Sequence, residues 1–150
     1  MRKFIIALFP FAALIVVGTV VVGTVVAATV VAQSSNPGNA AATGTAAPLL
    51  TKALSGVPGK EATMLTVTYP AGGASPAHRH NSDVFVYVLE GAVVMQVAGG
   101  KEVTLTAGQT FYESPTDIHS VSRNASTTAP AKILVFAVKA QGVPLTVPAK

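Results

Sequence analysis

Beyond residue 48, the apolar positions of the chain fall in short runs, and glycine or proline clusters separate one run from the next. No stretch there repeats its apolar residues at the spacing of a helix. The runs therefore predict β-strands at fairly regular intervals. Such a pattern is typical of an all-β sandwich or barrel, and we expect a small antiparallel β-barrel or jelly roll. The predicted strands are 64–69, 84–89, 92–97, 102–105, 109–113, 118–124 and 132–138.

One of these runs differs from the others. Residues 84–89 read VFVYVL and are apolar at every position. A strand that is covered on both faces has this composition, whereas a half-buried strand alternates. The pattern therefore predicts a strand with both faces buried.

A long uncharged segment precedes the predicted strands. Arg2 and Lys3 form a short basic head, and no charged residue follows until after Ala32. The apolar run exceeds the roughly 7–15 residues of a signal-peptide core and matches the about 20 residues that span a bilayer. We therefore expect residues 1–32 to form a hydrophobic leader helix, either a cleaved signal peptide or a retained membrane anchor. The basic head places the remaining chain across the membrane, in the periplasm or outside the cell, anchored to the inner membrane if the leader is retained.

The residues after the leader divide into a linker and one domain. Residues 33–48 are rich in Ala, Ser, Asn, Gly and Thr and are predicted to form a flexible linker, followed by a single domain over 49–150. The chain has no cysteine, which excludes a disulfide framework and a thiolate metal cluster. No basic run occurs, so nucleic acid is not an expected partner. Because so small a domain has a modest core, pairing into a homodimer would add stability.

The three histidines of the chain carry the candidate chemistry. His78 and His80 form a His-x-His step, and His119 lies in a later predicted strand. The period of a strand places His78 and His80 on the same face. Imidazole is a common ligand of transition metals, so the three rings are predicted to bind one divalent ion, namely iron, manganese, nickel, copper or zinc. The alternative interpretation is a set of solvated surface imidazoles.

The stretch 72–91 resembles the first motif of the cupin superfamily. That motif has a glycine, five residues, His-x-His, a short gap, a glutamate, six residues and a glycine. Gly72, His78, His80 and Gly91 match it.

The stretch 108–124 resembles the second cupin motif, in which a glycine opens a strand and a turn precedes a histidine. Gly108 and His119 match, whereas Asn124 falls one residue late for the motif's asparagine. The amino-acid sequences of both stretches are similar to those of small single-domain bacterial quercetin-dioxygenase-like cupins. The resemblance implies a metal-binding β-barrel whose histidines hold the ion.

The chain departs from the first motif at one important position. Val84 stands where the cupin glutamate would be, and a valine cannot bind metal. Asp83 is a possible additional ligand, although strand parity places it on the opposite face unless a bulge re-aims it. The remaining three-histidine set resembles the iron centres of some thiol dioxygenases and also hydrolytic zinc sites.

Two further residues near His119 are candidates for a role in chemistry. Glu113 lies at the end of a predicted strand, where it is either a solvated carboxylate or a group that orients a ligand or acts as general base. Arg123 shares the strand parity of His119, which would suit the holding of an anionic substrate.

The sequence thus predicts an exported metal-binding cupin. By resemblance, the expected reaction is oxidation of a small organic substrate by dioxygen at a non-haem metal, with Glu113 as a proton shuttle. Two alternatives stay open. One is a non-catalytic cupin that binds or senses a small ligand, and the other is a metal-assisted isomerase or lyase.

Overall fold

The computed structural model describes residues 42–149, and every regular element in that range is a β-strand. The all-β prediction is therefore confirmed for the described part of the chain. The predicted leader (1–32) and the first part of the predicted linker (33–41) lie outside the described residues. The strands are β1 (Thr45–Ala53), β2 (Lys60–Tyr69), β3 (Ala74–Ser75), β4 (His78–Arg79), β5 (Asp83–Glu90), β6 (Ala92–Val97), β7 (Val103–Thr106), β8 (Thr110–Glu113), β9 (His119–Asn124), β10 (Ala131–Ala140) and β11 (Val147–Pro148).

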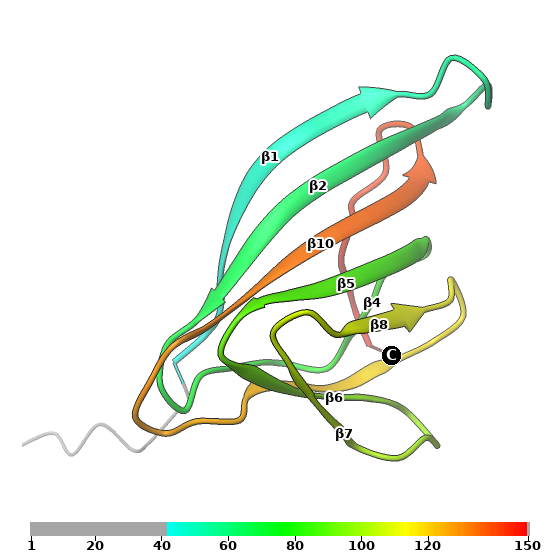
Figure 1. The fold of residues 1–150 in the computed structure, drawn as a ribbon. Coiled ribbons are helices and arrows are strands. Elements are labelled where there is room, and N and C mark those ends of the chain that lie inside the picture. Colours follow the sequence, from blue (N-terminus) through cyan, green and yellow to red (C-terminus); the bar gives the residue numbers. More distant parts are fainter. Residues whose placement is uncertain (1–41, 150) are drawn as a thin grey trace, which may run out of the picture. The chain divides into compact units, whose positions relative to one another are not determined.

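The strands form two sheets that face one another (Figure 1). The first sheet has the order β1-β2-β10-β5-β8, and the second has the order β11-β4-β9-β6-β7, with β3 also paired to β9. Every ladder between these strands is antiparallel. Between β4 and β11 the chain crosses repeatedly from one sheet to the other, which is the connectivity of a jelly roll.

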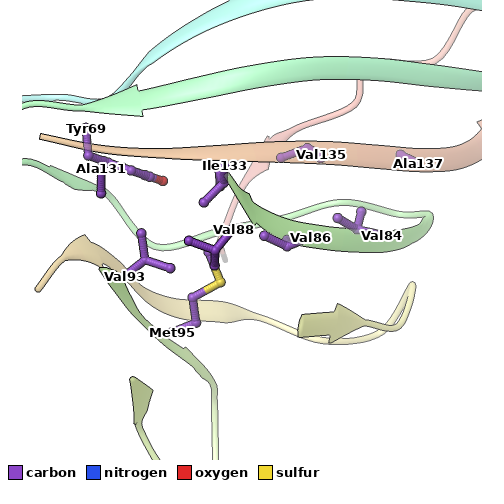
Figure 2. Close-up of a cluster of buried hydrophobic side chains, with 10 residues drawn as sticks. All are labelled: Tyr69, Val84, Val86, Val88, Val93, Met95, Ala131, Ile133, Val135 and Ala137. Carbon is purple, nitrogen blue, oxygen red and sulfur yellow. The ribbon is translucent and has the colours of Figure 1, made fainter. Parts of the chain in front are cut away.

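The hydrophobic core lies between the two sheets. Every second residue of β10, starting from Ala131, is buried, as expected when alternate side chains face inward. Figure 2 shows Val93 and Met95 of β6 reaching toward Val88 of β5. Full burial of side chains of this size contributes about 1.5–3 kcal/mol each. The buried cluster comprises Tyr69, Val84, Val86, Val88, Val93, Met95, Ala131, Ile133, Val135 and Ala137.

Strand β5 is covered on one face only, so the prediction of a strand buried on both faces is wrong. Val84, Val86 and Val88 are buried, whereas Phe85 and Tyr87 are 47% and 44% exposed. The sheet places these two residues on its outer face, and no described element covers that face. An unbroken apolar run therefore marks two different surfaces here, a core and an open face.

The exposed residues of β5 belong to an apolar row that crosses the whole first sheet. Leu50 of β1 pairs with Met64 of β2, and Met64 pairs with Phe136 of β10. Phe136 pairs in turn with Phe85, and Phe85 pairs with Tyr112 of β8. Side chains that are direct partners in a ladder lie on the same face. The outer face of the sheet thus carries a continuous apolar stripe, which we call the outer row.

Strand β1 begins at Thr45, inside the stretch predicted as a linker. It pairs with β2 along its length, and all of its residues are exposed. Backbone hydrogen bonds to β2 rather than buried side chains hold it, so its composition shows no strand period. The ordered domain therefore starts before Leu49, where the sequence predicted its first residue.

The three shortest strands carry no sequence signal, because two residues cannot display a period. Two of them nevertheless build the wall of the second sheet that contains the histidines. β4 pairs with β9 through His78 and His119, and β11 pairs with the other side of β4. Within residues 42–149, no helix reaches the length and apolarity that crossing a membrane requires.

Gly91 shows why the first motif ends with a glycine. Its φ is +70°, a conformation that glycine adopts without strain. A Cβ at this position would lie 2.8 Å from the carbonyl oxygen of Pro130. The turn from β5 to β6 therefore requires glycine for both its conformation and its close approach to the loop between β9 and β10.

Candidate metal centre

His78 and His80 point the same ring atom toward a common centre. The Nδ1 atom of His78 lies 2.8 Å from the carbonyl oxygen of Pro76, and that of His80 lies 3.1 Å from the carbonyl oxygen of Leu145. The two Nε2 atoms lie 3.1 Å from each other. The prediction that strand parity places both rings on one face is confirmed.

The two carbonyl contacts determine which nitrogen carries the proton. A carbonyl oxygen only accepts hydrogen bonds, so each Nδ1 donates its proton to one. In a neutral imidazole the other nitrogen then has a bare lone pair. Two bare Nε2 atoms thus face each other, an arrangement that a shared cation stabilises.

His119, on β9 of the same sheet as His78, completes the group of three histidines. It is the first residue of β9, directly after a turn that Asp117 closes by accepting a hydrogen bond from the Ser114 amide over 2.7 Å. Its ring centroid lies 5.0 Å from that of His78 and 6.5 Å from that of His80. One nitrogen of each ring lies within 4.8 Å of the others, a spacing that could hold one metal ion. The structure therefore brings together the three histidines that the sequence singled out.

Glu113 lies beside the same centre. It is the last residue of β8, and its side chain is 2% exposed. Its Oε2 atom lies 3.1 Å from Nδ1 of His119 and 3.6 Å from Nε2 of His80. The alternative of a solvated carboxylate at a strand end is therefore wrong, because the first sheet turns this residue into the interior.

Three buried atoms of the centre lack hydrogen-bond partners among the described residues. They are Oε2 of Glu113 and both ring nitrogens of His119. Buried polar atoms without partners are costly, and polar groups that bind an ion avoid this cost. Imidazole and carboxylate groups together suit iron, manganese, nickel, copper and zinc, so the residues present fit a divalent transition metal.

Burial also sets the protonation of His80. It lowers the pKa of this imidazole below its usual value of 6.5, and the Glu113 carboxylate opposes that shift. The neutral ring, which is the form that binds metals, therefore prevails at pH 7.

Asp83 does not join the histidines. Its Oδ1 atom accepts a hydrogen bond of 2.7 Å from the Tyr112 hydroxyl on the outer side of the first sheet. That bond is the main reason why the pKa of Tyr112 rises above its usual value of 10.0. No bulge re-aims Asp83, so strand parity keeps this possible ligand on the wrong face.

Arg123 does not reach the centre either, and the reason is a bulge in β9. The register of β9 with β6 shifts between Gln96 and Val97, where β9 contains an additional residue. The bulge reverses the parity of the residues that follow His119, so Ser122 faces inward. Arg123 faces outward instead and bonds Glu102 over 3.2 Å. The expectation that Arg123 shares the face of His119 is therefore wrong.

A cavity of about 370 Å³ opens from the histidines and runs between the two sheets. Apart from Glu113 and the histidines, no charged residue lines it among the described residues. Its volume is at the small end for sites that bind organic ligands. The apolar part of its wall includes Leu65, Val67, Val86, Ile133, Val135 and Leu145.

Hydroxyl groups form the other end of the cavity. The Tyr69 hydroxyl lies 2.7 Å from Oγ of Ser122 and 3.0 Å from Oγ of Ser75. The sequence did not single out these residues or Leu145. The hydroxyl groups meet in one cavity only because of the bulge in β9 and the packing of the two sheets against each other.

Residues 65–137 match the family model described as the cupin domain. This range includes the three histidines and Glu113. The chain contains a cupin domain. The resemblance read from the two motifs is therefore confirmed for the domain, although the likeness to quercetin dioxygenases goes beyond this match. No curated protein sequence matches the chain.

Solved structures share this cupin fold. The DMSP lyase DddQ from Ruegeria pomeroyi DSS-3 gives a TM-score of 0.57 at 19% identity, over 71% of this chain and 51% of that chain. A cupin domain from Bordetella pertussis Tohama I gives 0.53 at 19% identity, over 67% of this chain and 97% of that chain. An oxalate oxidase in complex with glycolate gives 0.50 at 23% identity, over 58% and 45%. This chain thus spans about half the length of the lyase, and the likeness shows the fold alone.

Proposed function

We propose that this protein is an exported, metal-dependent cupin enzyme that oxidises a small organic molecule with dioxygen. The observation that carries the proposal is the pair of bare Nε2 atoms of His78 and His80, 3.1 Å apart and close to His119. Such an arrangement suits a divalent transition metal. The cavity beside it provides room for a second reactant.

The lining of the cavity indicates the substrate class. Its walls are apolar and carry no lysine or arginine among the described residues. A substrate with a charged group away from the histidines would lose hydration there without gaining a partner. We therefore propose a substrate with an uncharged apolar body, a group that binds metal at one end and a hydroxyl or carbonyl group at the other.

The residues of the chain orient this substrate rather than react with it. The histidines hold the ion, and the Tyr69 hydroxyl lies where it can bond the far end of the molecule. A bound metal would supply Lewis acidity and, if redox-active, the means of combining dioxygen with the substrate. In a dioxygenase both oxygen atoms enter the organic product, so the reaction needs no further reductant.

The location of the enzyme follows from the sequence of residues 1–32. Their basic head and long apolar run support export to the periplasm or beyond, with inner-membrane anchoring if the segment is retained. Fractionation of cells, followed by sequencing of the mature N-terminus, tests this part of the proposal. Full-length protein in the cytoplasmic fraction would refute it.

Metal analysis of the full-length protein tests the site. We expect about one divalent metal per subunit, and its loss when His78→Ala and His119→Ala are combined. Gln96→Ala, on the neighbouring strand β6, serves as the control and should keep the metal. A wild-type protein that retains no metal after loading with each of the five candidate ions would overturn the proposal.

Oxygen consumption tests the reaction. The metal-loaded protein is mixed with flavonols, diketones or thiols, and oxygen uptake is followed together with product formation. Uptake that requires both metal and substrate supports the dioxygenase. Turnover without oxygen uptake would instead indicate an isomerase or lyase, and saturable binding without turnover would indicate a sensing cupin.

A further inference from the structure

We propose that Glu113 is a fourth protein ligand of the metal, and that it replaces from β8 the carboxylate that the cupin motif has lost at Val84. This inference rests on the metal centre of the proposed function. It assigns Glu113 to the ion, in place of the proton shuttle that the sequence suggested. Four observations support it.

The register of the first sheet places positions 84 and 113 beside each other on the same face. Val84 of β5 and Glu113 of β8 are direct partners in the antiparallel ladder. Such partners project their side chains to the same face, with Cβ atoms about 4.5–5.5 Å apart. Both side chains are buried, at 1% and 2% exposure, and both line the cavity. A carboxylate attached at either position therefore reaches the same volume.

The distances around the centre fit a shared ion. Oε2 of Glu113 lies 3.1 Å from Nδ1 of His119 and 3.6 Å from Nε2 of His80. The Nε2 atoms of His80 and His78 lie 3.1 Å apart. Ligands about 2.1 Å from a tetrahedral ion are separated from each other by roughly 3.4 Å. The carboxylate is thus spaced from its neighbours as one ligand is from the next.

The short contact between Glu113 and His119 is not a hydrogen bond. The ring N–H direction of His119 does not point at Oε2, and both atoms lack a hydrogen-bond partner among the described residues. A carboxylate that only oriented the imidazole would accept a proton from that nitrogen. The observed geometry instead suits two atoms that bind the same cation.

The charge of Glu113 leads to the same conclusion. No lysine or arginine lines the cavity among the described residues. Without a positive partner a buried carboxyl group is driven to its neutral form, and one that stays ionised is strongly destabilising. A divalent ion held by three neutral imidazoles supplies this charge, and the carboxylate reduces the net charge of the centre by one.

Metal affinity of three proteins tests the inference. The full-length wild type, Glu113→Gln and the double variant Val84→Glu/Glu113→Val are titrated with Zn²⁺ against a chromophoric chelator. Glutamine still accepts a hydrogen bond but binds metal poorly, so it separates a ligand from an orienting group. We expect Glu113→Gln to lose more than about 100-fold in affinity, beyond the range for groups that only orient a ligand. The double variant should regain affinity to within about tenfold of wild type.

A spectroscopic measurement on the same proteins gives an independent readout. Visible absorption of the cobalt-loaded proteins should change in position and intensity in Glu113→Gln and return toward the wild-type spectrum in the double variant, because these bands respond to the ligands of the ion. Thermal unfolding of each metal-free protein checks that the variants fold.

The outcomes separate the two proposals. If wild type binds no metal, the proposed function fails. If wild type binds metal and Glu113→Gln binds it equally well, only the inference about Glu113 is overturned. If Glu113→Gln loses the metal but the double variant does not regain it, position 84 does not reach the ion. The proposal that the β8 carboxylate replaces the one lost from β5 is then refuted.

Discussion

The hydroxyl of Tyr69 lies 2.7 Å from Oγ of Ser122 and joins the two sheets across the end of the cavity. Ser122 follows His119 by three residues, so their Cα atoms lie at most about 10 Å apart along β9. Tyr69 is 2% exposed, and its hydroxyl also contacts Ser75. The cavity therefore has a histidine end and a separate hydroxyl end.

Replacing Tyr69 with phenylalanine removes the hydroxyl and keeps the ring. We expect the free energy of unfolding to fall by about 1 kcal/mol, because the buried Ser122 hydroxyl and the half-buried Ser75 hydroxyl lose a partner. Zinc affinity should stay unchanged, since the ring nitrogens at the other end are untouched. Urea unfolding and chelator competition measure the two quantities. A parallel loss of zinc affinity would show that the two ends are not independent.

Asn124 should be among the least replaceable residues of the domain. Its Nδ2 atom donates to the carbonyl oxygens of Tyr69, Pro70 and Ala129, and its Oδ1 atom accepts from the Ser126 amide. We expect Asn124→Ala to lower the free energy of unfolding by about 3 kcal/mol, because four backbone groups, all at least partly buried at these contacts, lose their partner. Urea unfolding measures the loss.

The exposed Asn81 provides a matched control for that variant. Asn81→Ala should stay within about 0.5 kcal/mol of wild type, as surface substitutions usually do. An Asn124→Ala protein as stable as Asn81→Ala would contradict the assigned role of the Asn124 side chain.

The pair of Glu61 and Lys139 predicts a loss of stability in acid. A hydrogen bond from the Lys139 ammonium is the main cause that lowers the pKa of Glu61 below its usual value of 4.5. Because the folded state favours the ionised carboxylate, the pair stabilises the fold above about pH 4.5. This contribution disappears as the pH falls through the lowered pKa of the folded state.

Glu61→Gln should therefore lower the thermal midpoint at pH 7. Between about pH 5 and pH 3, the thermal midpoint of this variant should fall less than that of the wild type. Thermal unfolding at a series of pH values measures this change. Glu102→Gln is the control, because Glu102 and its partner Arg123 are about half exposed and such pairs contribute little. Equal acid sensitivity of wild type and Glu61→Gln would refute the assignment.

The outer row predicts how two copies of the chain would pair. Phe85 and Tyr112, the last two members of the row, are 47% and 50% exposed, and their ring centroids lie 5.3 Å apart. Half of a large aromatic side chain is about 100 Å². Phe85, Tyr112 and the neighbouring Tyr87 would each bury about this area, and Leu50, Met64 and Phe136 would bury less. Two copies would together bury roughly 1,000 Å², the lower end for a specific interface. We therefore expect the predicted homodimer to form through this face.

Sedimentation of the full-length protein measures the oligomeric state. Phe85→Glu should shift it toward the monomer, because a charge within the row would be buried without a partner. Val57→Glu is the control, since Val57 is 49% exposed but lies outside the row. A wild-type monomer, or a dimer that Phe85→Glu leaves intact, would contradict this prediction.

The sequence by itself determined the class of the fold and the three histidines that the structure brings together. Alternating apolar residues and glycine turns marked the seven longer strands from β2 to β10, apart from residues at their ends. The spacing of His78, His80 and His119 within two motifs indicated a shared centre. These signals are local, because strand parity and turn chemistry depend on neighbouring residues.

The tertiary structure alone decided which other groups reach that centre. Strand pairing placed Glu113 opposite Val84, and the bulge in β9 turned Ser122 inward and Arg123 outward. Parity within one strand cannot reveal the register between two strands, and one additional residue reverses the face of all that follow it. The histidines could therefore be predicted from their spacing, whereas the surrounding carboxylate and hydroxyl groups required the assembled sheets.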